Sequence, residues 1–82
     1  MDFKTIDDID KIITGKKQTK RFILKNQIKT VYIAKDAENN VIDEIIQLCN
    51  EKKIELIYID EMQELGKICN IDVNAAVAAV LK

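Results

Sequence analysis

The sequence predicts an α/β fold in which helices cover both faces of a small sheet. Stretches with the periodicity of amphipathic helices alternate with short runs of β-branched apolar residues. Proline is absent and only two glycines occur, which argues against an all-β fold built on tight turns. With 82 residues and 48% hydrophobic content, residues 1–82 are expected to form one domain around a single core.

Two helices are predicted in the first third of the chain. The first begins at Thr5, where the segment TIDD resembles a capping box with carboxylates in the first turn. Gly15 ends this helix, and a second helix is expected from about Lys17 to Lys25, with Phe22 and Ile23 facing inward. The first helix would turn four isoleucines toward the core: Ile6, Ile9, Ile12 and Ile13.

Three apolar runs predict strands. The run Ile28–Ala34 contains the β-branched and aromatic residues that pleated strands favour, and Ile54–Ile59 is apolar apart from Glu55. The last run, AVAAVL at residues 76–81, fits a helix by composition. Its short length and its position favour a buried strand instead.

Two further helices are predicted between these strands. Asn39 and Asn40 are good N-caps for a helix at Val41–Lys53, which has a broad apolar face. Asp60 is expected to cap a short helix that runs through Cys69, with Gln63 at the capping-box position. Residues 70–74 then form a loop before the last strand.

Positive charge is concentrated in one segment. Between Asp10 and Asp36 the chain has eight basic residues and no acidic one, a local charge of +8. The remainder has five basic and fourteen acidic residues, a charge of −9. An ordinary surface helix mixes both signs, because oppositely charged pairs three or four residues apart are stabilising. The alternative of a merely solvated helix face does not explain this separation, so we expect a surface that binds a polyanion.

Within this segment, Lys17, Gln18 and Arg21 are spaced to share one face of a helix. They lie in its first turns, where unpaired backbone N–H groups and the helix dipole favour phosphate. Lys and Arg suit guanine O6 and N7, and Gln suits adenine N6 and N7, so the three can read purine edges. Because undistorted RNA closes its major groove to a helix, the target is expected to be DNA or RNA with an opened groove.

Other functional chemistry has little support in the sequence. The chain has no histidine, and Cys49 and Cys69 stand far apart in apolar segments. We therefore expect two buried free thiols rather than a disulfide or a zinc site. The segment Gly15-Lys16-Lys17 lacks the upstream glycine and the following serine or threonine of a phosphate-binding P-loop. No catalytic residue, metal or cofactor is expected.

Three segments taken together resemble the kink-turn-binding ribosomal protein family of L7Ae and L30e: GKKQTKRFI, VYIAKDA and ELGKICNIDVNAAVAAV. The likeness extends from Ile6 to Leu81, and the order of the segments is more specific than any one of them. It implies a three-layer α/β/α sandwich with a four-stranded mixed sheet. It also implies that the basic helix enters the widened groove of a kink-turn RNA, where tandem sheared G·A pairs turn their purine edges outward.

The resemblance assigns RNA contacts to individual positions. Lys17, Gln18 and Arg21 match the positions that read the G·A pairs. Asn26 and Asn70 stand where the family usually has glycine, which implies left-handed backbone at both. The other implied contacts are Gly15 at the helix start, Lys16 and Lys20 near the RNA backbone, Lys25 and Lys29 at phosphates on the rim, and Ile71, Asp72 and Val73 on the kink and its extruded nucleotide.

We therefore expect a non-catalytic protein that recognises and stabilises kink-turns, in ribosomal RNA or a riboswitch. The alternative is a ribosome-associated structural protein that binds ribosomal RNA, with the ribosome as partner. A third interpretation, a small enzyme or phosphocarrier using Cys49 or Cys69, requires an alkylatable thiol of low pKa. No apolar run reaches the roughly 18 residues of a membrane span, and Met1-Asp2-Phe3 is not expected to open a signal peptide, so we expect a cytoplasmic protein without a membrane partner. We also expect a monomer.

Overall fold

The structure, a computed structural model, describes residues 11–69 and 74–82 of the chain. Within these residues, four strands alternate with three helices. None of these helices is long and apolar enough to cross a membrane. The elements are β1 (Ile12–Thr14), α1 (Lys16–Leu24), β2 (Ile28–Ala34), α2 (Asn39–Lys52), β3 (Glu55–Ile59), α3 (Met62–Ile68) and β4 (Val77–Leu81).

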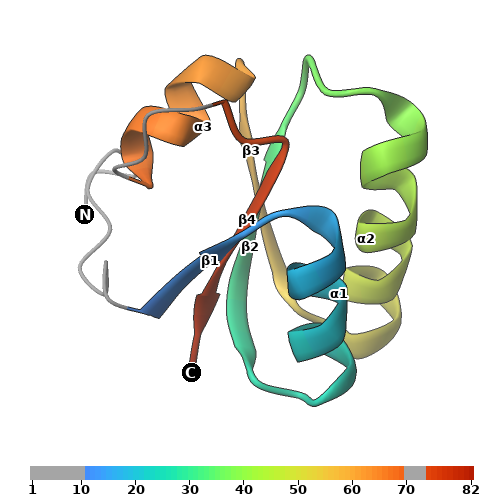
Figure 1. The fold of residues 1–82 in the computed structure, drawn as a ribbon. Helices are drawn as coiled ribbons and strands as arrows, with labels where there is room; N and C mark the ends of the chain where they lie inside the picture. Colours follow the sequence, from blue (N-terminus) through green and yellow to red (C-terminus); the bar gives the residue numbers. More distant parts are fainter. Residues whose placement is uncertain (1–10, 70–73) are drawn as a thin grey trace.

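The strands form one mixed sheet in the order β1-β4-β2-β3. Strands β2 and β3 are parallel, whereas β4 runs antiparallel to both of its neighbours, β1 and β2. Helices α1 and α2 cover one face of the sheet and α3 covers the other (Figure 1). The expected three-layer α/β/α sandwich with a four-stranded mixed sheet is thus confirmed.

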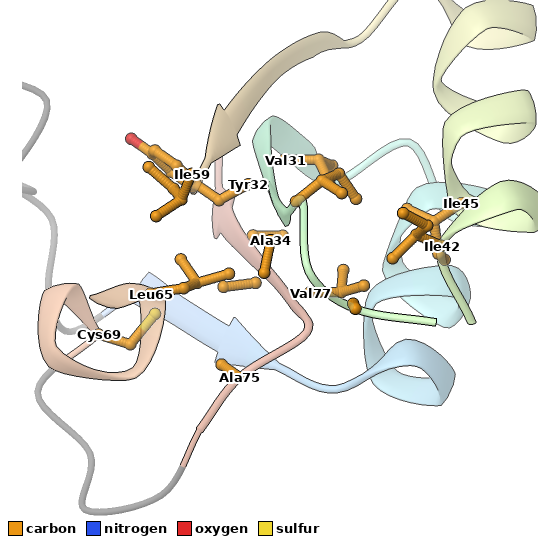
Figure 2. Close-up of a cluster of buried hydrophobic side chains, with 14 of the residues drawn as sticks. Val31, Tyr32, Ala34, Ile42, Ile45, Ile59, Leu65, Cys69, Ala75 and Val77 are labelled. Carbon is orange, nitrogen blue, oxygen red and sulfur yellow. The ribbon is translucent and has the colours of Figure 1, made fainter. Parts of the chain in front are cut away.

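Helices cover both faces of the sheet, which explains why residues 31–34 of its central strand β2 are all apolar and buried, without alternation. Val31 points toward Ile42 and Ile45 of α2, whereas Ala34 lies on the opposite face near Leu65 of α3 (Figure 2). All five side chains are buried. The strands predicted from apolar runs are therefore present: β2 has the predicted bounds, and β3 and β4 each begin one residue later than predicted.

The prediction of a first helix is wrong over residues 12–14. Ile12 and Ile13 lie in β1, an edge strand that pairs with Val80 and Ala79 of β4. All three residues of β1 are β-branched, which favours extended backbone, and the pairing covers an edge that β4 would otherwise expose. Tertiary pairing therefore overrides the helical spacing of the isoleucines. The predicted start of that helix, at Thr5, lies outside the described residues.

The predicted N-cap of α2 is also wrong. The helix begins at Asn39, so Asn39 and Asn40 lie within its first turn, and the N-cap residue is Glu38 in extended backbone. The chain makes a tight turn directly after β2, in which the N–H of Ala37 donates to the carbonyl of Ala34 at 3.2 Å. The helix therefore starts as soon as the turn is complete.

Helix α3 is capped from a distant part of the chain. Its N-cap residue is Glu61 rather than the predicted Asp60, which moves Gln63 from the third to the second helical position and removes the predicted capping box. The N–H of Met62 instead donates to Oδ1 of Asp36, in the loop after β2, at 2.8 Å. A carboxylate 26 residues away thus satisfies this helix terminus, and a local sequence pattern does not reveal it.

The strand pairing brings the starts of α1, α2 and α3 to one end of the sheet. Parallel strands β2 and β3 lead into α2 and α3, and β1 ends opposite the start of β4 and leads into α1. The N–H of Gly15 donates to the carbonyl of Val77, and the N–H of Ala34 to that of Ala76, each at 3.0 Å. Helix α1 therefore begins beside the segment that enters β4 (Figure 1).

Candidate nucleic-acid interface

Helix α1 starts at a glycine that its backbone conformation requires. Gly15 has φ 96° and ψ 148°, a combination that residues with a Cβ rarely adopt. This conformation turns the chain sharply from β1 into α1 while its N–H stays bonded to Val77. No acidic residue lies in the first turn of α1, so nothing on the helix itself neutralises its positive end.

The outer face of α1 carries the residues predicted to read purine edges. Lys17, Gln18 and Arg21 are all exposed, whereas Thr19 and Ile23 are buried against the sheet and α2. Within residues 11–69 and 74–82, neither Lys17 nor Arg21 forms an ion pair. The structure thus places the three side chains together on one solvent-facing surface, and their contact with RNA stays a prediction.

Two other lysines of α1 are held by an acidic residue of α2. Lys20 Nζ donates to Oε2 of Glu44 at 3.1 Å, and Lys16 Nζ lies 3.6 Å from Oε1 of the same carboxylate. Lys16 Nζ also donates to the backbone carbonyl of Asn40 at 3.3 Å. The hydrogen bond from Lys20, reinforced by the charge of Lys16, holds the pKa of Glu44 below its usual value. The basic segment has no acid of its own, but the fold supplies one.

The two remaining predicted lysines lie farther along the chain. Lys25, the C-cap residue of α1, places Nζ 5.8 Å from the centroid of the Phe22 ring, a cation–π geometry. Together with Leu24 and other residues of α1, it lines a shallow hollow of about 440 Å³ on the exposed face of the helix. Lys29 is exposed on β2 and does not line this hollow.

The predicted second contact region is the loop before β4. Ile71, Asp72 and Val73 lie outside the described residues. Asn74 is exposed, and the N–H of Ala75 donates to the carbonyl of Met62 at 3.1 Å. Because the next residues lead to Val77, the partner of Gly15, the end of this loop is fixed beside the start of α1.

The turn after α1 has the backbone that the resemblance implied. Asn26 has φ 58°, in the left-handed region, and its side-chain Oδ1 accepts a hydrogen bond from Lys52 Nζ at 3.1 Å. The expectation for Asn26 is confirmed, and Asn70 lies outside the described residues. Lys53, at the end of α2, also has left-handed backbone, with φ 57°.

The two cysteines lie in the hydrophobic core. Cys49 and Cys69 are both buried free thiols, as predicted. Burial raises the pKa of each thiol to about 11, the opposite of what a nucleophilic cysteine requires. Among the described residues, no group of three or more His, Cys, Asp or Glu side chains is placed to hold a metal ion.

Sequence reasoning missed two residues of this surface. Glu44 escaped because its contact with Lys20 joins residues 24 positions apart on different helices. Leu24 did carry a signal, since it stands three, four and seven residues after cationic positions and therefore shares their face.

Comparison with known sequences identifies relatives over nearly the whole chain. Residues 3–82 match the family described as "Ribosomal protein L7Ae/L30e/S12e/Gadd45 family". RNA-binding protein TTE2299 of Caldanaerobacter subterraneus subsp. tengcongensis is 51% identical over 69 residues, which cover 84% of each chain. RNA-binding protein YbxF of Geobacillus stearothermophilus is 33% identical over 82 residues, which cover 100% of each chain.

A solved structure has the same fold. The Giardia lamblia 15.5kD RNA binding protein superposes with a TM-score of 0.84 over 90% of this chain. This chain spans 62% of that protein's length, and the two sequences are 24% identical. At this identity the likeness establishes the fold alone.

Proposed function

We propose that this chain, which belongs to the ribosomal protein L7Ae/L30e/S12e/Gadd45 family, binds RNA through the exposed face of α1. The observation that carries the proposal is the cluster of Lys17, Gln18 and Arg21, exposed on a helix whose first turn has no acid. The names of the relatives TTE2299 and YbxF, both called RNA-binding proteins, support the same partner.

The finer proposal is that the RNA is a kink-turn. Cationic and amide side chains on one helix face match the purine edges that tandem sheared G·A pairs present in an opened groove. Arg21 and Lys17 would face guanine edges, with Gln18 beside them. The end of the loop before β4 is fixed next to Gly15, so Ile71, Asp72 and Val73 are the proposed contacts with the kink itself.

The proposed mechanism is a shift in the RNA population. A free kink-turn exchanges between extended and bent forms, and a protein that binds the bent form alone moves the equilibrium toward it. The extent of bending is then set by the difference in affinity for the two forms, which requires no catalysis by the protein. Helix α1 suits this role because its buried residues Ile23 and Thr19 anchor it on the sheet and so fix the position of its exposed face.

The test is a bending assay on a doubly labelled RNA kink-turn in magnesium-free buffer. A parallel RNA has its G·A pairs replaced by Watson–Crick pairs. We expect a rise in energy transfer with the first RNA and none with the second. Equal weak binding to both RNAs, fading steeply with salt, would reduce the function to non-specific attraction of a polyanion.

Two variants refine this test. Arg21→Ala should cost about 1–3 kcal/mol of binding free energy with the G·A-containing RNA and much less with the Watson–Crick control. Lys29→Ala should weaken binding to both RNAs alike and reduce the salt slope by about 1. Both residues are exposed, so neither variant removes a core contact. Equal losses at the two positions, whichever RNA is used, would contradict base reading by Arg21.

A ribosomal role is the second candidate, favoured by the family to which the chain belongs. In this case the same basic face would bind ribosomal RNA, while the acidic remainder of the surface meets protein. Co-sedimentation with ribosomes through a salt-washed gradient separates the two cases. Stoichiometric recovery with one subunit indicates a ribosomal component, whereas loss from the ribosome with retained kink-turn bending indicates a separate RNA partner.

A further inference from the structure

Leu24 is an exposed apolar residue in the middle of a cationic face. Its side chain is 53% exposed, the largest value among the big apolar side chains of the described residues. It follows Arg21 by three residues, Lys20 by four and Lys17 by seven, so all four lie along one side of α1. A single exposed leucine is unremarkable in a folded protein. This one is distinguished by its surroundings.

Those surroundings form a concave surface. Leu24 lines the hollow of about 440 Å³ together with four cationic residues: Lys17, Lys20, Arg21 and Lys25. The lining is mainly apolar, because the aliphatic stems of these side chains cover the helix while their charged ends reach the rim. Two of these side chains have partners: Lys25 Nζ lies 5.8 Å from the centroid of the Phe22 ring, and Lys20 Nζ donates to Oε2 of Glu44 at 3.1 Å.

The chemistry of this hollow selects for an apolar surface that carries negative charge at its edge. A phosphate alone would use the rim and leave Leu24 in water. A nucleotide fits both parts, since its sugar and base present an apolar face and its phosphate lies beside them. We infer that the hollow receives one nucleotide of the bound RNA, with its sugar or base against Leu24 and its phosphate toward Arg21 and the lysines. This inference rests on the proposed function of α1.

The test compares two substitutions for which charge alone predicts no loss of RNA binding. Leu24→Ala removes the apolar contact, and we expect about 4- to 12-fold weaker binding to the kink-turn RNA, from re-exposure of roughly half a leucine side chain. The salt slope should stay unchanged, because no cation is lost. Leu24→Lys adds a cation to the basic face, and we expect it to bind more weakly than the wild type despite that charge.

A different pair of results would overturn the inference. If Leu24→Lys binds more tightly, with a steeper salt slope, and Leu24→Ala binds like the wild type, then charge alone acts here and the hollow holds no nucleotide. Both variants should fold, since alanine and lysine are good helix formers at an exposed position. Circular dichroism checks this point.

A matched control uses the other exposed large apolar side chain of the described residues. Tyr58 on β3 is 47% exposed and lies outside the hollow, so Tyr58→Thr should leave RNA affinity unchanged.

The wild-type measurement separates the inference about the hollow from the proposal that the RNA is a kink-turn. Failure of the wild type to distinguish the G·A-containing RNA from its control ends the kink-turn proposal. Normal discrimination by a protein in which both Leu24 variants bind without loss ends only the inference about the hollow.

Discussion

Glu44 lies outside the basic segment, yet it determines how many lysines of that segment are free to bind phosphate. Glu44 accepts contacts from both Lys16 and Lys20, at 3.6 and 3.1 Å, so the face of α1 divides into two sets. Lys17, Arg21 and Lys25 face solvent without a carboxylate partner in the described part of the chain. Exposed ion pairs are weak, so a phosphate can compete with Glu44 for either lysine. The affinity for RNA should then reflect this competition.

Replacing Glu44 by glutamine tests the competition. Glu44→Gln keeps the shape of the side chain and removes its charge, so Lys16 and Lys20 become available to phosphate. We expect tighter RNA binding and a salt slope steeper by about one to two units, since each phosphate contact contributes roughly 0.7–0.9. Glu51→Gln on the same helix makes the same change of net charge at an exposed position away from these lysines. An equal effect from both variants would show that only net charge matters.

The lowered pKa of Glu44 also gives the ion pair a pH window. Because the folded-state pKa lies below the ordinary value, the pair stabilises the protein fully above that ordinary value of 4.5. Its contribution is lost as the pH falls through the folded-state pKa. The difference in melting temperature between wild type and Glu44→Gln should therefore be present at about pH 7 and shrink steadily as the pH falls below 4.5. A difference that persists in acid would mean that the substitution acts through packing.

At the scale of elements, the junction between β1 and α1 holds the site in place. Sequence periodicity predicted a helix through Ile12 and Ile13, because a three-residue edge strand is too short to produce a period of its own. The longer strands β2 and β3 and the helices α1 and α2 were predictable, since each has enough residues to display its pattern. Caps such as Asp36 on α3 were not, because they depend on contacts between distant loops.

Gly15 is the residue on which this junction depends. Gly15→Ala should lower the free energy of unfolding by about 1–3 kcal/mol, because alanine is strained at φ 96°. A new Cβ meets no atom within 4 Å, so the cost is backbone strain and not a clash. Urea denaturation of the two proteins measures it.

Lys53 provides a control for backbone strain, because it is a non-glycine residue with positive φ. It ends α2 with φ 57°, so Lys53→Gly relieves a left-handed strain of about 1 kcal/mol that the greater freedom of glycine in the unfolded chain partly offsets. We expect Lys53→Gly to be neutral or slightly stabilising, in contrast to Gly15→Ala. Unchanged stability in Gly15→Ala would mean that glycine has no special role at position 15.

At the scale of the whole molecule, sequence and fold contribute different parts of the candidate site. The separation of charge, the face of Lys17, Gln18 and Arg21, and the buried cysteines follow from sequence alone. The approach of the segment before β4 to Gly15 follows from sheet topology, and a single sequence does not show which strands become neighbours. The four-stranded mixed sheet was therefore predicted from the family resemblance, because a family shares one strand order.

The two cysteines lie in the two layers of the core, one on each side of the sheet. Their reactivity toward an alkylating agent tests the remaining alternative, a cysteine-dependent enzyme. Cys49 of α2 and Cys69, after α3, lie on opposite sides of the sheet, and both are buried. Native protein at neutral pH should therefore resist iodoacetamide at both positions, and alkylation should appear only as urea unfolds the chain. Rapid alkylation of the folded protein at either position would instead indicate an activated thiolate.

The same burial predicts a loss of stability in alkali. The folded state raises each thiol pKa from 9.0 to about 11, so above pH 9 the unfolded chain releases protons that the folded chain retains. The unfolded state then binds fewer protons, and the free energy of unfolding must fall as the pH rises from about 9 to about 11. Tyr32, whose pKa burial also raises, adds to this fall at higher pH.

A double variant, Cys49→Ala with Cys69→Ala, tests this prediction. It should be less stable than the wild type at about pH 7 because of the cavities, yet it should lose less stability than the wild type between about pH 9 and about pH 11. Equal pH dependence in both proteins would place the alkaline transition on Tyr32 instead of the thiols.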